Sequence, residues 1–361
     1  MISKRKLGIF FHIIVSFVLV SKVNKVHTIL LDQSNDSFIQ ISRSFFVMNE
    51  RIFIVDSKAG NIKIFNMDGR LKNIFGKKGA GPNEFLLPSN CDISSEYLFV
   101  LDRNQRHFLV FDWVGGSSFQ YKKKLFSLYL ADEFKILHKD HILIAGYNKI
   151  GKQQFNSKSY HFYIQSLNKD SNEFLLPSHI AFGCNSHKEY LSRFATEFKY
   201  VGRKGFCDFD SKYYYFILQS NLKVIKIDRK TKEISTFGKT TENYMNPFIS
   251  KRLKDSFGKK IKIYWEEVKK FSHIRNIFVT KSNMIGVIYS NWKNNRINIF
   301  LQLYSQDQTF KSEELLLSSL SDSIFDIVFY FNKSKNQLYI LDNEPTEDDD
   351  IMHKIHSFNV L

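Results

Sequence analysis

Short apolar runs separated by turn residues dominate the chain, and one pair of runs occurs twice near the N-terminus. Ile52–Asp56 is followed by Ile62–Phe65, and the same pattern returns as Leu98–Asp102 followed by Phe108–Phe111. Each first run ends in an aspartate at the same offset. Such runs predict buried β-strands. A repeat of about 46 residues made of short strands is typical of a β-propeller blade.

The same rhythm continues to the C-terminus and predicts six blades. The most apolar strand of each lies near Ile52–Val55, Leu98–Leu101, His141–Ala145, Tyr213–Leu218, Met284–Tyr289 and Gln337–Leu341. A second, alternating strand follows at Ile62–Phe65, Phe108–Phe111, His161–Leu167, Leu222–Ile227, Ile297–Tyr304 and Lys354–Phe358. The high aromatic content of 16% suits strands stacked face to face. We therefore expect an all-β fold, a six-bladed β-propeller over residues 26–361.

Two further patterns bear on the ring. The last unit lacks sequence for a fourth strand, whereas Val26–Leu31 is a lone strand-like run, so we expect this run to join the blade that contains Gln337–Leu341. Closure of this kind protects the edges of an open sheet. The segment Asn83–Ser89 also recurs identically as Asn172–Ser178, close to two periods later, which we interpret as a second trace of the repeat.

Two segments break the strand pattern and predict helical inserts in later blades. Apolar residues fall at helical spacing around Tyr190–Phe198 and again around Ile261–Phe271, the latter preceded by Ile249, Leu253 and Phe257. Loops on a rigid scaffold often carry function. We expect both inserts to rim one mouth of the ring; the alternative is that they cap exposed blade edges.

A glycine-rich motif runs from Phe75 to Pro88. A phosphate loop is excluded because the motif leads into a strand and lacks the Lys-Ser/Thr ending. A turn between blades is the better interpretation, with Gly81 at positive φ, Pro82 fixing the exit and Phe85 inserted between two sheets. The residues of this structural motif are Gly76, Gly79, Gly81, Pro82, Glu84, Phe85 and Pro88, together with the strand-ending Asp56 and Asp102.

This motif resembles the NHL-type six-bladed propellers. More narrowly, it resembles an exported bacterial family described as six-bladed β-propeller proteins. The match covers about residues 45–115; a later copy, Phe237 to Pro247, keeps the frame without the glycine cluster, and Asn83 stands where Gly is more usual. The resemblance implies the fold and export. It implies no common reaction.

The first 21 residues have the layout of an export signal. Lys4, Arg5 and Lys6 precede the apolar run Leu7–Val20, which is short for a membrane span. We expect residues 1–21 to be a signal peptide or an N-terminal anchor, and the protein to be periplasmic, at the cell envelope or extracellular. The net charge of +16 is spread along the whole chain, which favours a solvated lysine-rich surface over a dedicated site for anionic polymers.

No catalytic or metal-binding motif stands out. Asp56, Asp102 and Asp342 end equivalent strands and are interpreted as turn caps rather than a carboxylate ring for a cation. The acidic run of Glu344 and residues 347–350 lacks the spacing of a calcium loop. His138 and His141 are expected on opposite faces of a strand. Of the three cysteines, Cys184 and Cys207 could pair after export, although isolated buried thiols such as Cys91 are the simpler interpretation.

The expected function is a non-enzymatic propeller scaffold that binds a ligand at one mouth. Its partner would be an unknown protein or an anionic glycan, with membrane contact only through the N-terminal segment. One alternative is a lactonase-like propeller hydrolase or lyase that uses a channel metal. Another is a basic-face propeller that binds nucleic acid, which export disfavours. We expect the channel to hold no cluster of three carboxylates or of His and carboxylates; the sequence identifies no cofactor.

Overall fold

The computed structural model describes residues 23–127, 130–138, 141–147, 160–166, 172–177, 181, 184, 188–189, 204–321, 327–346 and 350–360. Three expectations therefore lie outside the described residues: the leader over residues 1–21, the first helical insert around Tyr190–Phe198, and residues 347–349 of the acidic run.

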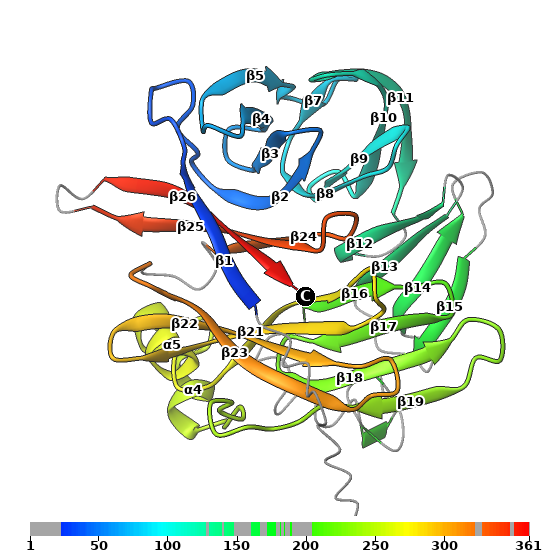
Figure 1. Ribbon diagram of the computed structural model, residues 1–361, viewed down its shortest axis with the longest axis vertical. Coiled ribbons are helices and arrows are strands. Elements are labelled where there is room, and N and C mark those ends of the chain that lie inside the picture. Colours follow the sequence, from blue (N-terminus) through cyan, green and yellow to red (C-terminus); the bar gives the residue numbers. More distant parts are fainter. Residues whose placement is uncertain are drawn as a thin grey trace, which may run out of the picture.

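Six four-stranded antiparallel sheets form a ring (Figure 1), which confirms the predicted six-bladed β-propeller. From the channel outward, blade 1 holds β2 (Ser42–Met48), β3 (Arg51–Asp56), β4 (Asn61–Asn66) and β5 (Leu71–Phe75), and blade 2 holds β8 (Pro88–Ile93), β9 (Tyr97–Asp102), β10 (His107–Gly115) and β11 (Ser118–Phe126). Blade 3 holds β12 (Leu130–His138), β13 (His141–Tyr147), β14 (Tyr160–Ser166) and β15 (Asn172–Pro177), and blade 4 holds β16 (Gly205–Phe209), β17 (Tyr213–Leu218), β18 (Asn221–Asp228) and β19 (Ile234–Phe237). Blade 5 holds β20 (His273–Val279), β21 (Ile285–Lys293), β22 (Arg296–Tyr304) and β23 (Phe310–Ser319).

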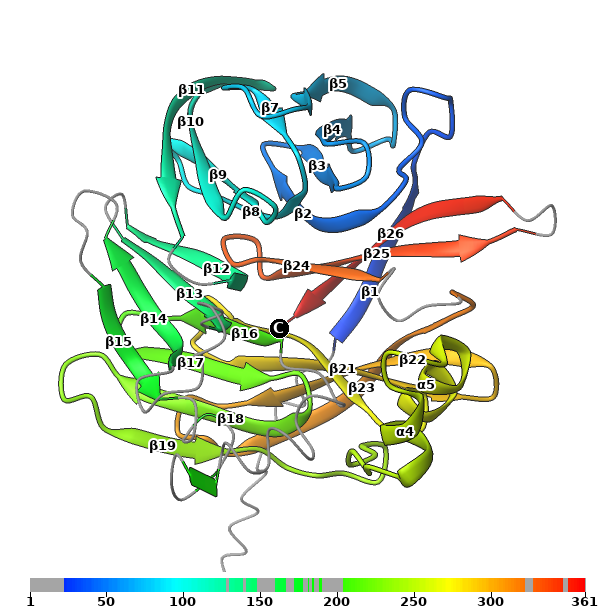
Figure 2. The ribbon, with the colours of Figure 1, turned by 180° about the vertical axis from the view of Figure 1, so that it is seen from behind.

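The N-terminal strand closes the ring, as expected. Blade 6 consists of β24 (Val328–Asn332), β25 (Gln337–Pro345), β26 (Ile351–Val360) and, outermost, β1 (Val23–Leu30). Strand β1 runs antiparallel to β26, with Val23 opposite Val360 and Leu30 opposite Lys354. Both views show the blue first strand lying against the red last one (Figure 2). Strand β1 therefore covers the edge of β26 and completes the fourth strand of blade 6.

The strongly apolar runs of the sequence form the second strand of every blade. In blades 1 and 2, the last five residues of β3 and of β9 are all buried. These strands lie inside their own sheet, and both of their faces pack against neighbouring blades, so they are continuously apolar rather than alternating. The buried side chains accordingly form a separate cluster between each pair of blades; Ile62, Phe85, Leu98 and Phe111, for example, share the cluster between blades 1 and 2.

The two identical heptapeptides occupy different places, so their interpretation as a repeat was wrong. The first, Asn83–Ser89, crosses from the blade 1 connection through β7 (Glu84–Phe85) into the inner strand β8. The described part of the second, Asn172–Pro177, forms β15, the outermost strand of blade 3. Phe85 is 0% exposed, whereas the corresponding Phe174 is 41% exposed. The same phenylalanine is buried in one copy and exposed in the other. Tertiary context, not local sequence, therefore sets the structure of this segment.

The glycine-rich motif is the turn between blades 1 and 2, as predicted, but Gly81 is not its strained residue. A short parallel pair of β6 (Lys77–Lys78) and β7 folds the motif back on itself. Gly76 has a φ of 79°, and a Cβ there would lie 2.3 Å from the ring of Phe85. Gly81 has no positive φ. Its amide instead donates to Oε2 of Glu84 at 2.9 Å, so the glutamate organises the turn.

The repeated aspartates act as backbone caps. Asp56 Oδ2 and Oδ1 accept the amides of Gln40 and Ile41 at 2.9 and 3.2 Å, and Oδ1 also accepts that of Ala59 at 3.2 Å. Asp102 makes the same three contacts at the same offsets, to Leu86, Leu87 and Gln105. Each carboxylate ties the segment that enters an inner strand to the end of the second strand. Asp342 differs, because its Oδ1 accepts from Ser319 Oγ at 2.7 Å.

We expect Asp102→Ala to lower the free energy of unfolding by about 1–3 kcal/mol, because it leaves three partly buried amide donors without their acceptor. Chemical denaturation measures the change. Asp112→Ala, which removes a partly exposed carboxylate from the Lys122 ion pair on β10, is the matched control and should change stability by less than about 0.5 kcal/mol. Equal effects of the two substitutions would contradict the capping role.

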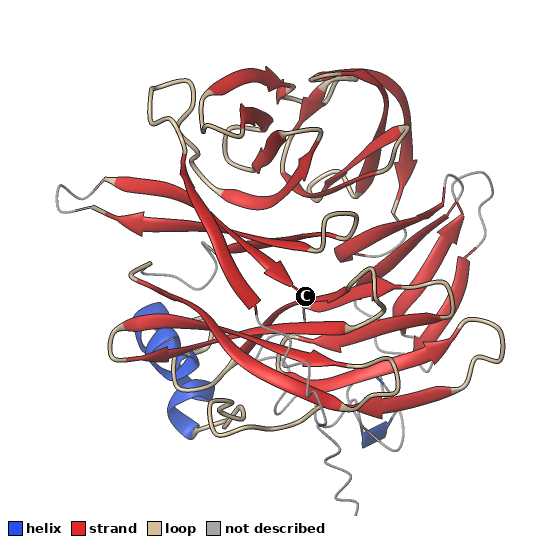
Figure 3. Cartoon of the chain, viewed as in Figure 1, coloured by secondary structure: helices blue, strands red, loops and turns tan. Residues whose placement is uncertain are grey.

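The second predicted insert is helical and joins blade 4 to blade 5. It contains α4 (Lys251–Ser256) and α5 (Ile261–Val268), which stand out as helices against the strands (Figure 3). Ser250 begins α4, since its Oγ accepts the amide of Leu253 at 2.9 Å. Leu253, Val268 and Phe271 form a small core between the two helices.

Candidate functional site

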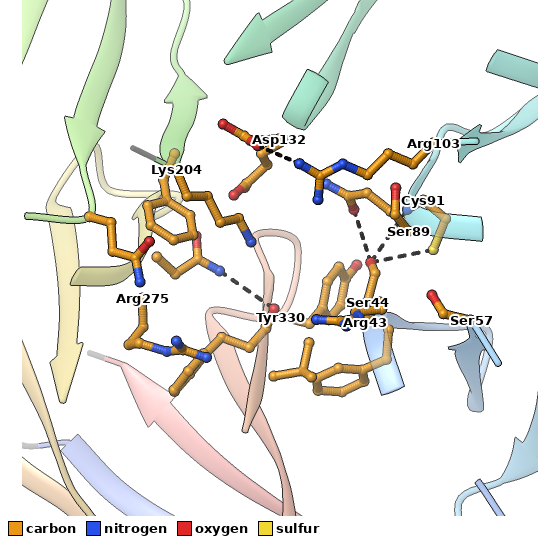
Figure 4. Close-up of a pocket in the computed structure, with 18 of the residues that line it drawn as sticks. Arg43, Ser44, Ser57, Ser89, Cys91, Arg103, Asp132, Lys204, Arg275 and Tyr330 are labelled. Atoms are coloured by element: carbon orange, nitrogen blue, oxygen red, sulfur yellow. Dashed lines mark hydrogen bonds and ion pairs between the residues drawn. The ribbon is translucent and has the colours of Figure 1, made fainter. Parts of the chain in front are cut away.

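A pocket of about 480 Å³ lies in the ring and is lined by residues of the inner strand of every blade. Inner strands of neighbouring blades contact one another around the whole ring, so the pocket occupies the central channel. Its volume falls in the range of small-molecule sites, about 300–1,000 Å³. Figure 4 shows side chains of Arg43, Arg103, Lys204 and Arg275 reaching toward one space from different blades.

Cationic side chains outnumber carboxylates in this pocket. Two ion pairs lie in the lining: Arg103 Nη2 lies 3.4 Å from Asp132 Oδ1, and Lys135 Nζ lies 3.8 Å from Glu133 Oε1. The lining cations are Arg43, Arg103, Lys135, Lys204 and Arg275, and the lining carboxylates are Asp92, Asp132 and Glu133. The lining therefore carries a net positive charge when all of these groups are ionised.

Two of the cations are positioned by aromatic rings. Lys204 Nζ lies 4.7 Å from the centroid of Phe206, at the start of β16. The Arg275 guanidinium lies 5.9 Å from the centroid of Phe329, and its Nη2 donates to the carbonyl of Ile327 at 2.9 Å. Attraction between a cation and a ring face holds each long side chain in a limited set of orientations.

Polar residues of the inner strands link adjacent blades. Asp92 Oδ2 of blade 2 accepts the amide of Ile136 in blade 3 at 2.8 Å. Asp208 Oδ2 of blade 4 accepts the amide of Val279 in blade 5 at 2.7 Å. Ser44 of blade 1 donates from Oγ to Asn90 Oδ1 of blade 2 at 3.0 Å. Polar residues of the inner strands thus satisfy backbone and side-chain groups of the adjacent blade.

Three carboxyls of the inner strands, those of Glu133, Asp92 and Asp208, have raised pKa values, so their neutral forms are favoured more than usual. Burial raises the pKa of Glu133 to about 7, against the opposing attraction of Lys135 and then Lys204. Burial likewise raises the pKa values of Asp92 and Asp208. A carboxyl that titrates near neutrality inside a pocket is a recognised mark of a functional site.

The residues singled out in the sequence contribute little to this pocket directly. The carboxylates of Asp56 and Asp102 are capped by backbone amides, although the next residues, Ser57 and Arg103, line the pocket. The second helical insert does reach the mouth, because Phe257 and Tyr264 line the pocket. No residue of the glycine-rich turn before Phe85 lines it.

The lining cations were missed because five distant segments of the sequence supply them. Arg43 and Arg275 lie in the inner strands β2 and β20, and Lys204 lies just before the inner strand β16. A basic residue in or just before an inner strand is the signal that could have identified them.

The candidate metal ligands do not converge. Among the described residues, no group of three or more His, Cys, Asp or Glu side chains is arranged to hold a metal ion. His138 and His141 do not point to opposite faces, as the sequence suggested, because they belong to different strands. They sit opposite each other in the β12–β13 pair, with ring centroids 4.5 Å apart.

All three cysteines are buried, and none of them forms a disulfide. Cys184 and Cys207 share the core between blades 3 and 4 without forming a disulfide, as the simpler interpretation held. Burial raises the pKa of the Cys91 thiol to about 12. A thiol of this kind is a poor nucleophile at neutral pH.

Comparisons with solved structures return the same fold. A member of the DUF4221 family from Bacteroides vulgatus is 11% identical, with a TM-score of 0.62 over 94% of this chain and 99% of that one. A protein of Bacteroides fragilis described as exported is 13% identical, with a TM-score of 0.54 over 92% and 94%. A luciferin-regenerating enzyme is 10% identical, with a TM-score of 0.50 over 94% and 96%. At such identities the likeness shows the fold alone.

Two other observations complete the comparison. No curated protein matches the sequence. Within the described part of the chain, no helix has the length and apolar character needed to cross a bilayer. A family model, DUF5128, described as a 6-bladed beta-propeller, matches residues 15–324, and the chain therefore belongs to this family of six-bladed β-propellers.

Proposed function

We propose that the protein is a binding scaffold whose central pocket holds a small anionic ligand, and that the ligand is an acidic saccharide. The observation that carries the proposal is the convergence of Arg43, Arg103, Lys204 and Arg275 on one pocket of about 480 Å³. Cationic side chains that point into a concave, partly apolar site attract anions. This attraction is stronger there than in open solution, because less water surrounds the charges.

The rest of the lining supports a sugar as the body of the ligand. Asn90, Gln219 and Asn276 supply side-chain amides that can donate to and accept from hydroxyl groups. Tyr264 and Tyr330 supply aromatic faces with polar edges. An acidic saccharide offers a carboxylate or sulfate to the cations, hydroxyls to the amides and C–H groups to the rings.

Export to the cell envelope belongs to the same proposal. It is supported by the basic and apolar leader of the sequence and by the fold relative from Bacteroides fragilis that is described as exported. Acidic saccharides are abundant outside cells, so the proposed place and the proposed ligand agree.

A propeller hydrolase or lyase is the second candidate. Glu133 favours it, because a carboxyl in the pocket with a pKa of about 7 is suited to accept or donate a proton at neutral pH. A lyase acting on an acidic sugar would need such a base beside cations that stabilise the developing charge.

Calorimetric titration with a uronic-acid disaccharide, and with its neutral methyl-ester counterpart, tests the binding function. We expect Lys204→Met and Arg103→Met each to weaken binding of the acid by about 10–100-fold, as loss of a charge-assisted hydrogen bond would. Arg70→Met, on an exposed turn of blade 1, should bind like the parent. Equal affinity for the acid and the ester would contradict the role of the cations. Conversion of the disaccharide, lost in Glu133→Gln, would favour the enzyme.

A further inference from the structure

The helical insert carries a surface that neither its own core nor the pocket uses. Phe248 and Ile261 are 77% and 68% exposed, the two highest values for large apolar side chains among the described residues. The insert surface, as we name it, consists of these two residues and the exposed Lys251, Lys254, Lys259, Lys260 and Lys262.

The insert is anchored firmly on its other side. Ser250 Oγ donates to Glu267 Oε2 at 2.7 Å, which joins the start of α4 to the end of α5. Lys269 Nζ lies 3.7 Å from the ring centroid of Trp292 and so links the insert to blade 5. Leu253, with its neighbours, fills the core between the helices. The apolar residues of the insert surface are thus not the ones that hold the insert in place.

The lysines of the insert surface have no acidic partner among the described residues. Arg252 and Lys270 differ from them, because they pair with Glu266 and Glu267. Several like charges close together on a short hairpin repel one another. A negatively charged partner would remove that cost.

We propose that the insert surface docks the propeller onto a membrane that contains anionic lipids. Basic side chains attract the negative headgroup layer, and neighbouring Phe and Ile side chains enter the boundary between headgroups and acyl chains. The two interactions reinforce each other only when the residue types are interleaved, and in this hairpin Ile261 lies between Lys260 and Lys262.

A lipid surface fits better than a dissolved polyanion. Nucleic acid or an acidic polysaccharide would pair with the lysines, but neither offers an apolar layer for Phe248 and Ile261. This docking surface is independent of the pocket cations. It would be a second membrane contact, besides the N-terminal segment that the sequence suggested as the sole one.

Vesicle co-sedimentation of the full chain tests the proposal, with phosphatidylcholine vesicles that contain or lack phosphatidylglycerol. We expect binding at least tenfold stronger to the anionic vesicles and weaker at high salt. The triple variant Lys259→Glu/Lys260→Glu/Lys262→Glu should lose most of that preference. The matched control is Lys58→Glu/Lys72→Glu/Lys78→Glu, which changes three exposed lysines of blade 1 and its turn and should bind like the parent.

Lysine acetylation read by mass spectrometry separates the insert from any contact of the leader. Anionic vesicles should protect Lys259, Lys260 and Lys262 and leave Lys72 reactive. Phe248→Ser/Ile261→Ser should weaken vesicle binding at least threefold while its melting temperature stays at the parent value. Unprotected insert lysines, or equal losses in both triple variants, would overturn the proposal. The proposal would also be overturned if heparin protected the insert lysines and Phe248→Ser/Ile261→Ser bound vesicles as well as the parent does.

Discussion

Phe85→Ala is expected to lower the free energy of unfolding by about 3–5 kcal/mol, the usual cost of deleting a fully buried aromatic side chain. The ring of Phe85 lies between blades 1 and 2, 6.1 Å from the centroid of Phe75 and 6.0 Å from that of Phe111. Truncation leaves a cavity that neighbouring rings on two different sheets can fill only partly. Urea denaturation monitored by circular dichroism gives the change.

The chain supplies an unusually close control for this substitution. Phe174 occupies the same position in the identical heptapeptide but lies exposed on the outer strand of blade 3. Phe174→Ala should cost less than about 1 kcal/mol. Similar losses in the two variants would mean that the residue type, rather than its place between blades, determines its contribution.

His273→Gln is expected to make the protein less sensitive to acid. His273 is buried at the start of β20, where its Nε2 lies 3.0 Å from the carbonyl oxygen of Val268. Burial, and then the nearby Arg275, lower its pKa from 6.5 to about 4. Because the folded chain binds this proton more weakly than the unfolded chain, the contribution of His273 is complete above pH 6.5 and is lost as the pH falls toward 4.

The size of this effect follows from the pKa difference. At about 1.4 kcal/mol for each pKa unit, His273 accounts for roughly 3 kcal/mol between pH 6.5 and pH 4. Free energies of unfolding measured from pH 7.5 to pH 4 should therefore fall more steeply for the parent than for His273→Gln. Parallel curves would show that His273 is not kept neutral by its surroundings.

Glu133→Gln should change the pH dependence in the opposite sense. The pKa of Glu133 is raised to about 7 by burial, so the folded chain binds this proton more strongly than the unfolded chain does. Its contribution is complete below about pH 4.5 and is lost as the pH rises through 7. Relative to the parent, Glu133→Gln should therefore gain stability as the pH rises from about 4.5 to 7. Comparison of the Glu133→Gln and His273→Gln curves should show the two opposite pH effects separately.

The ring itself could be predicted because its most buried strands lie inside their sheets. Strands such as β9 and β17 pack on both faces, so their sequences are continuous apolar runs. Such runs can be recognised without any tertiary information. The repeated Asp56 and Asp102 could be recognised as caps for a related reason. Their partners lie at fixed, short distances along the chain.

The pocket could not be predicted, because its strands obey a different rule. Inner strands such as β8 and β12 carry charged residues, since some of their side chains line the channel and hydrogen-bond to the next blade. Arg43 and Arg275 are far apart in the sequence and meet only when the ring closes. The composition of the chain gives its net positive charge, but it does not show that several basic side chains meet at one pocket.

Local pattern also misled at two positions. Gly81 stands in a glycine-rich turn, yet the residue that needs left-handed backbone is Gly76, where Phe85 leaves no room for a Cβ. His138 and His141 are three residues apart, but a strand pair rather than a single strand joins them. Both errors arise where a turn, rather than a regular strand, decides which way a side chain points.

Closure by β1 has a mechanical consequence for the molecule. Val23 at the beginning of the ring sits beside Val360 at its end, so opposing forces applied to the two ends would open the β1–β26 ladder one pair at a time from Val23 inward. A ladder peeled in this way yields at a low force, unlike one sheared along its length, since each hydrogen bond is loaded alone. During synthesis, likewise, β1 emerges before any other strand and waits for β26, its last-made partner. Blade 6 is therefore both the last blade to be completed and the first to be opened by tension.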